Sequence, residues 1–414
     1  MTSTSTVANG SDATSAALQG LRGVNIVCFA KEWKEDPTSC NHVLKELARH
    51  NRVLWVNSIS TRAPNLASGR DLAKIFRKLW AFLSSFLRGA EQVGENMWLF
   101  NPIVLPLHNR RWVVRLNRFL LRFTLGLQRR RLGMGRFQLW TFVHTACDYV
   151  GTLGEDLVVY YCTDNWESFG FADKQNVGGM VNTLATRADV VFATSRPLVE
   201  KLEPFNRHTY LASHGVNYDL FARALSGDLP VPADIAALPR PIIGFFGLVE
   251  EWMDQELIAY LAQRHPEWSI ALIGKINVDV SRLSEFPNIH FLGRKAHGDL
   301  PAYCKAFDVA LIPHKINRLT EHMNPIKLRE YISAGLPIVS VDLPEMRHFP
   351  EACTIAPDHA AFEAAVVAAL AADSPDRREA RSRTMREETW PHKVKAIGDT
   401  VAKVQAQVAS RSHV

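Results

Sequence analysis

The segment Asn324 to Gly335, NPIKLREYISAG, combines residues suited to gripping a diphosphate. Asn324 is a favourable helix N-cap, and Pro325 suits the first helical position because its missing N–H costs nothing there. The free amides and the positive dipole end of such a helix favour bound phosphate. Lys327 and Glu330 are three residues apart and therefore share one helix face.

On that face Lys327 would neutralise phosphate, while Glu330 would accept hydrogen bonds from two ribose hydroxyls. The same spacing also fits an amphipathic helix that carries an N-cap and a surface ion pair. Both interpretations stay open on spacing alone.

These residues must be positioned by a parallel sheet, because short apolar runs alternate with helical patterns along the chain. In the first half we expect strands at residues 25–30, 52–58, 97–102, 137–143, 157–163, 190–195 and 209–213. The second half repeats the pattern at 241–247, 268–274, 288–293, 309–314 and 337–342. The pattern predicts two Rossmann-like α/β domains that face each other across a cleft.

The expected boundaries follow from composition. Residues 1–19 are rich in Ser, Thr and Ala without the apolar core of a secretion signal, and are expected to be a disordered tail. We expect an N-terminal domain at 20–225, a Pro-rich linker at 226–240, a C-terminal domain at 241–390 and a final helix at 391–414 that crosses back.

Bulk composition excludes several classes of protein. Hydrophobic residues make up 47% of the 414 and charged residues 22%, as in an ordinary globular protein. The six cysteines form no CxxC pair, so no zinc or redox motif is indicated, and a reducing cytoplasm fits best. Arginines interrupt the longest apolar stretches before they reach the length of a membrane span.

A basic amphipathic segment, RRWVVRLNRFLLRFTLGLQRRR at 110–131, holds eight arginines and no acidic residue. Helical spacing puts four of them on one face, at Arg111, Arg115, Arg118 and Arg122. The segment from Asp71 to Arg88 has a similar basic amphipathic pattern. We expect both to contact an anionic membrane surface rather than nucleic acid, although solvated arginines on a helix packed against the sheet would give the same pattern.

The string PIKLREYISAGLPIV resembles the donor-site signature of glycosyltransferase family 4 and its GT-B relatives. RVLWVNS, VVYYCTDNWESF, ADVVFATS, SHGVNYDLF and GFFG precede it in the order seen in bacterial exopolysaccharide and teichuronic-acid-type glycosyltransferases. The resemblance spans most of the chain and implies the GT-B fold. It implies transfer of a sugar from a nucleotide-diphosphate sugar, with retention and without a metal or other cofactor.

The same resemblance assigns roles along the donor side. Glu330 would hold the ribose, and Asn324 with Lys327 would contact the diphosphate. Gly247, after the first strand of the second domain, would let backbone approach the donor, although a plain tight turn explains it equally. Arg294 would lie near the base, where a surface arginine is equally ordinary.

The first domain would supply the catalytic and acceptor residues. Asp164 would lie near the reacting centre or cap a turn, and His214 is a catalytic candidate or a structural histidine. Three residues of the first strand-to-helix loop would face the acceptor: Trp33, Asp36 and Ser39.

Two departures from the family pattern concern the donor. Many members carry a second glutamate earlier in the chain, but the residue eight before Glu330 is His322, preceded by Glu321. The usual Arg and Lys after the first strand of the second domain are absent from GFFGLVEEWMDQE. Phosphate neutralisation would therefore depend on Lys327 and the helix start.

These features favour an enzyme at the cytoplasmic face of the plasma membrane that extends a lipid-linked or oligosaccharide acceptor. A nucleotide-sugar epimerase of the same architecture and a catalytically silent membrane-associated scaffold are the alternatives. An epimerase needs no basic acceptor surface, whereas the two departures keep the scaffold open.

Overall fold

The computed structural model describes residues 20–35, 37–58, 89–102, 104–105, 111–169 and 174–411. The expected tail at 1–19, Asp36, the basic stretch from Asp71 to Arg88 and Arg110 lie outside these residues.

The first domain is built on an eight-stranded sheet with the order β3-β4-β2-β1-β5-β6-β7-β8. All neighbouring strands are parallel except β3, which pairs with β4 as an antiparallel edge. The strands are β1 (Asn25–Phe29), β2 (Arg52–Val56), β3 (Glu91–Gly94), β4 (Met97–Phe100), β5 (Gln138–Thr141), β6 (Leu157–Cys162), β7 (Val190–Ala193) and β8 (Thr209–Leu211).

Helices cover both faces of this sheet because its strands bury side chains on both sides. On β1, Val27 and Phe29 enter one hydrophobic cluster, while Ile26 and Cys28 enter the other. The first face carries α3 (Arg111–Arg131), α4 (Lys174–Arg187) and α5 (Arg196–Leu202). The second carries α1 (Ser39–Ala48) and α13 (Trp390–Arg411).

The second domain has a parallel sheet of six described strands with the order β11-β10-β9-β12-β13-β14. The strands are β9 (Ile242–Phe246), β10 (Ser269–Ile273), β11 (Ile289–Gly293), β12 (Val309–Ile312), β13 (Ile338–Val341) and β14 (Cys353–Ala356). Its helices are α6 (Tyr218–Ala222), α7 (Ala233–Ala236), α8 (Gln255–Arg264), α9 (Leu300–Ala306), α10 (Ile326–Ser333), α11 (His359–Ala372) and α12 (Pro375–Arg383).

Short 3-10 turns complete the described elements. They are η1 (His144–Ala146), η2 (Trp166–Ser168), η3 (Arg223–Leu225), η4 (Leu283–Glu285), η5 (His297–Asp299), η6 (Thr320–His322) and η7 (Pro344–His348).

The chain passes between the domains earlier than its composition suggests. The stretch 226–240, expected to be a linker, packs on the second domain, where Lys305 Nζ donates to the carbonyl of Ser226 at 2.7 Å. Phe221 and Ile235 belong to the core of the second sheet. The first domain's hydrophobic cluster reaches Ala212, so the passage lies between Ala212 and Val216.

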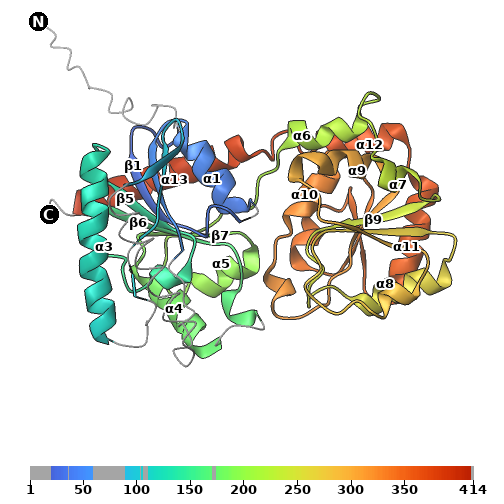
Figure 1. Ribbon diagram of the computed structural model, residues 1–414, viewed down its shortest axis with the longest axis horizontal. Helices are drawn as coiled ribbons and strands as arrows, with labels where there is room; N and C mark the ends of the chain where they lie inside the picture. Colours follow the sequence, from blue (N-terminus) through green and yellow to red (C-terminus); the bar gives the residue numbers. More distant parts are fainter. Residues whose placement is uncertain are drawn as a thin grey trace, which may run out of the picture.

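The C-terminal helix returns to the first domain, as predicted. Figure 1 shows α13, in red, lying beside α1. Trp390, Val394 and Ile397 are buried in the same cluster as Val43 and Leu44 of α1. The predicted architecture of two Rossmann-like domains is confirmed, and β3 and β14 are strands that the sequence did not predict.

Candidate functional site

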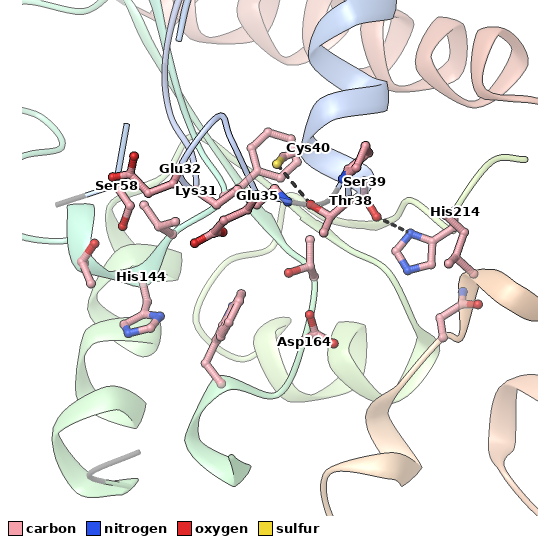
Figure 2. A pocket seen from close by; sticks show the side chains of 18 residues that line it. Lys31, Glu32, Glu35, Thr38, Ser39, Cys40, Ser58, His144, Asp164 and His214 are labelled. Carbon is pink, nitrogen blue, oxygen red and sulfur yellow. Dashed lines mark hydrogen bonds between the residues drawn. The ribbon is translucent and has the colours of Figure 1, made fainter. Parts of the chain in front are cut away.

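A pocket of about 720 Å³ opens at the carboxyl ends of the first sheet. The loops after β1, β5 and β6 line it together with the start of α1, and Figure 2 shows their side chains around one hollow. The second domain contributes Asn324 and Ile326. This is the edge where open parallel sheets bind ligands.

Of the predicted residues, Ser39, Asp164, His214 and Asn324 all line this pocket. Ser39 begins α1, so its side chain stands at the positive end of a ten-residue helix. Its Oγ lies 2.8 Å from His214 Nδ1. Ser39, His214 and Asn324, which are distant in sequence, therefore line the same pocket as Asp164.

His214 is a buried, uncharged imidazole. Burial, reinforced by the nearby Arg329 cation, lowers the pKa of His214 to about 3. The neutral ring can share a proton with Ser39 through this hydrogen bond. It is therefore suited to orienting that hydroxyl.

Asp164 follows β6 and has the opposite kind of shift. Burial raises the pKa of Asp164 to about 7, against a smaller lowering by its hydrogen bond with Thr163. A carboxyl that titrates near neutrality can both accept and donate a proton at working pH.

His144 lines the same pocket, and our sequence reasoning did not single it out. It follows β5 in the way that Asp164 follows β6, so the rule that was applied to Asp164 would have found it. Its Nδ1 is buried with no hydrogen-bond partner among the described residues, and the same holds for Thr145 Oγ1 and Trp166 Nε1. Burial lowers the pKa of His144 to about 4. The residues themselves line the pocket, although these three atoms are covered.

The predicted N-cap is wrong by one residue. Helix α10 begins at Ile326, and Pro325 is the N-cap. Asn324 is not available to cap because its amide Nδ2 donates to the Thr194 carbonyl at 2.7 Å, while its Oδ1 accepts from Arg329 Nη1 at 2.7 Å. Since Thr194 belongs to the first domain, Asn324 joins the two domains beside the pocket.

Further hydrogen bonds extend this seam between the domains. Ser195 Oγ donates to the His322 carbonyl at 2.7 Å. The amide of Arg196 donates to Glu345 Oε1 at 2.9 Å. His322 occupies the position of the earlier glutamate in the family pattern. Its backbone carbonyl contributes to the contact between the two domains.

Lys327 lies against Gly247, the residue after β9, and Gly247 in turn lies against Gly274, the residue after β10. A Cβ on Gly247, whose φ is +143°, would lie 2.5 Å from Lys327 Nζ. A Cβ on Gly274, with φ +150°, would lie 1.8 Å from the Gly247 carbonyl oxygen. The two glycines leave the room that the ammonium occupies, and no larger residue fits there.

Burial also makes Lys327 an easily discharged cation. It lowers the pKa of Lys327 to about 7, although the nearby Glu330 carboxylate opposes the change. The ammonium lies 4.1 Å from the centre of the Phe245 ring, a cation–π contact that favours its charged form.

Glu330 shares the helix face with Lys327 and is paired with a histidine. Its side chain is 6% exposed, and its Oε1 lies 2.8 Å from His297 Nε2. This hydrogen bond raises the pKa of His297 against the effect of burial. A buried carboxylate held from one side keeps its second oxygen for another donor.

The other predicted residues lie elsewhere. Trp33 stacks edge-on against Trp55 at 5.0 Å between ring centres and packs on the core, not on the pocket wall. Arg294 is exposed after β11 and does not line the pocket. Asp36 lies outside the described residues.

Two searches of the described residues were negative. No three His, Cys, Asp or Glu side chains in that part of the chain come together as metal ligands. None of its helices is both long and apolar enough to cross a membrane.

The family comparison covers the second domain. Residues 240–372 match the family model of glycosyl transferases group 1. The chain is 25% identical over 212 residues to TuaH of Bacillus subtilis (strain 168), named as a teichuronic acid biosynthesis glycosyltransferase. That match covers 46% of this chain and 51% of TuaH, so the chain spans about half the length of the curated relative it matches.

Solved structures match nearly the whole chain. Anabaena HepE in complex with UDP and glucose aligns over 94% of this chain and 99% of its own, with a TM-score of 0.55 and 16% identity. An E. coli trehalose-6-phosphate structure bound with UDP-2-fluoro glucose aligns over 92% and 99%, with a TM-score of 0.61 and 12% identity. The protein has the GT-B fold.

Sucrose-phosphate synthase from Thermosynechococcus elongatus also matches, over 94% of this chain and 98% of its own, with a TM-score of 0.60 and 15% identity. The predicted resemblance of this GT-B protein to bacterial polysaccharide glycosyltransferases is confirmed.

Proposed function

We propose that this GT-B protein is a glycosyltransferase that takes a hexose from a nucleotide-diphosphate sugar. The carrying observation is the cluster of Lys327 against Gly247 with Glu330 one turn along, inside the region that matches glycosyl transferases group 1. Lys327 binds the diphosphate, and the free oxygen of Glu330 accepts a ribose hydroxyl. HepE is described in complex with UDP and glucose, which supports a donor of this class.

The leaving diphosphate is stabilised without a metal ion. Lys327 and the amides at the start of α10 supply positive charge where negative charge develops. Transfer proceeds with retention at the anomeric carbon, and Asp164 and His214 act on the first-domain side of the pocket. Arg294 lies on the side of the nucleotide base.

The acceptor is a lipid-linked glycan or oligosaccharide of a bacterial cell-surface polysaccharide. The likeness to a protein named for teichuronic acid biosynthesis supports this class. His144, Thr145 and Trp166 line the pocket with side chains that combine polar groups and rings, which suits a sugar. Ser39 faces the acceptor from the opposite side, at the start of α1.

The enzyme works at the inner face of the plasma membrane, attached through α3. Arg111, Arg115 and Arg122 are exposed on that helix, whereas Arg118 Nε turns inward to the Asp148 carbonyl at 2.7 Å. Exposed aromatic side chains accompany the arginines, as an interfacial helix requires.

The donor assignment is tested by calorimetry with a panel of UDP- and GDP-sugars. We expect Glu330→Ala, and the isosteric Glu330→Gln, to weaken donor binding by roughly tenfold or more, because a charge-assisted hydrogen bond is lost. Glu379→Ala is the matched control, since that carboxylate is exposed on α12 and pairs with Arg383. Unchanged binding in a folded Glu330 variant contradicts the assignment.

Catalysis is tested separately from binding. Incubation with donor and a membrane extract should release the nucleotide from the wild type. A donor-binding chain that releases none would be a scaffold rather than a transferase.

A further inference from the structure

A second hollow lies on the outer side of the first domain, and it shares no lining residue with the pocket that contains Asp164 and His214. It is a groove of about 560 Å³ along the C-terminal half of α3. Arg122, Arg129 and Arg130 line it together with Phe123. Gly126 lies between them, and a Cβ added there would meet no atom within 4 Å. The missing side chain therefore leaves room in the groove.

The lining of the groove carries positive charge from its three arginines. Of the described residues that line it, none is acidic. Two carboxylates outside the lining, Glu155 and Asp156, act on Arg129 and oppose the lowering of its pKa by burial. Glu155 also accepts from the amides of Gly151 and Leu153 at 2.6 and 2.8 Å. Asp156 is paired with Arg136 at 3.1 Å.

Arg129 is held in place but not satisfied. Its guanidinium stacks 3.7 Å from the centre of the Phe137 ring, and its Nη2 donates to the Gly135 carbonyl. Its Nε is buried and has no hydrogen-bond partner among the described residues. A guanidinium that is held in place and lines the groove is suited to a phosphate oxygen.

An apolar stripe leads into the groove along the same helix. Trp112, Leu116, Phe119 and Phe123 are 61%, 38%, 65% and 57% exposed, and their spacing of four, three and four residues keeps them on one face. The opposite face of α3 packs on the core through Val113, Leu121 and Leu125. Figure 1 shows α3 at the edge of the first domain that is farthest from the second domain.

We propose that this groove binds the phosphate of an anionic phospholipid headgroup while the apolar stripe enters the bilayer interface. The inference rests on the membrane attachment proposed above but adds a defined headgroup site. A lipid fits better than free phosphate or nucleic acid, because only a lipid rewards burial of the four exposed apolar side chains beside the arginines.

The test fills the groove without changing its charge. Gly126→Leu places a side chain between the arginines, and Gly126→Ala is the matched control with the same backbone effect. We expect Gly126→Leu to weaken co-sedimentation with phosphatidylglycerol–phosphatidylcholine vesicles about tenfold, the loss of one charge-assisted contact. Gly126→Ala should bind like the wild type.

Vesicles of equal negative charge made with oleate in place of phosphatidylglycerol separate headgroup recognition from general attraction. The double variant Arg129→Gln/Arg130→Gln should lose its preference for phosphatidylglycerol. Arg111→Gln/Arg115→Gln, on the same helix but outside the groove, should weaken binding to both vesicles alike, by roughly fivefold per charge.

Three results would overturn the proposal. The first is equal losses on both vesicle types for Gly126→Leu, and the second is unchanged binding in that variant. The third is release from vesicles by inorganic phosphate or by RNA at the same ionic strength as an ineffective chloride control, which would identify another ligand. Donor calorimetry on each variant reports folding and the donor site, so its result stands apart from the vesicle result.

Discussion

Helices α10 and α3 both carry cations, but they place them in opposite surroundings. On α10, Arg329 is 3% exposed and contacts Asn324, Glu388 and the Phe349 ring. On α3, Arg115 and Arg122 are exposed. Enclosed cations fix the geometry of the protein itself, whereas exposed ones are available to an external anion. The role of an arginine in a helix is therefore decided by whether its guanidinium is buried or exposed, and not by how many arginines the helix contains.

Of the variants that test this difference between α10 and α3, the loss of Arg329 should have the largest effect on stability. We expect Arg329→Leu to lower the free energy of unfolding by about 3–5 kcal/mol, because the buried Asn324 loses its partner and the half-buried Glu388 loses one of its two cations. Thermal and urea denaturation measure the loss. Arg115→Leu on α3 should change stability by less than about 0.5 kcal/mol. Similar values for the two variants would contradict the distinction.

The next test compares the buried face of α3 with its exposed face. Leu121→Ala, on the fully buried face, should cost about 3 kcal/mol through a cavity. Phe119→Ser, on the exposed face, should leave the denaturation midpoint nearly unchanged and reduce vesicle binding instead. A large loss of stability in Phe119→Ser would mean that this ring is covered by the protein itself.

The smallest effect concerns the discharge of Lys327. Burial lowers its pKa to about 7, so the folded state binds fewer protons than the unfolded state between that value and the ordinary lysine pKa. Stability of the free protein therefore rises with pH through this window. Donor affinity changes in the other direction, falling roughly tenfold between about pH 6 and about pH 8 as the ammonium is lost.

Calorimetry with a UDP- or GDP-sugar across this pH range measures the effect. Lys327→Met should give weaker binding and remove this component of the pH dependence. A wild-type profile that is flat from about pH 6 to about pH 8 would show that the ammonium does not contact the diphosphate.

The sequence predicted the strands because their apolar runs reflect burial on both faces of the sheet. The same reasoning missed β3, whose EQVG sequence is polar because it forms an edge, and β14, an edge strand that is buried only at its two end residues. The expected linker contained Ile235, whose burial in the second domain depends on tertiary packing. Local composition does not record such contacts.

The residues of the candidate site also fall into those that local spacing predicts and those whose contacts depend on the tertiary fold. Lys327 and Glu330 were found because helical spacing is local, and His144 follows a strand and was within reach of the same rule. The partner of Asn324 is Thr194, 130 residues away, and that of Glu330 is His297 in another loop. These contacts exist only after both sheets have formed, so residue spacing could not predict them.

The return of α13 gives the molecule two connections between its domains, side by side. Val216 on the outgoing connection donates its amide to the Glu388 carbonyl on the returning one at 2.9 Å, and it bridges to Thr389. Gly215 passes so close to Trp390 that an added Cβ would lie 2.6 Å from its amide nitrogen. Two connecting segments that are hydrogen-bonded to each other act as one hinge: they permit the domains to open and close, but they resist rotation of one domain about the line that joins the two. We therefore expect the relative motion of the domains to be a hinge motion about this pair of segments.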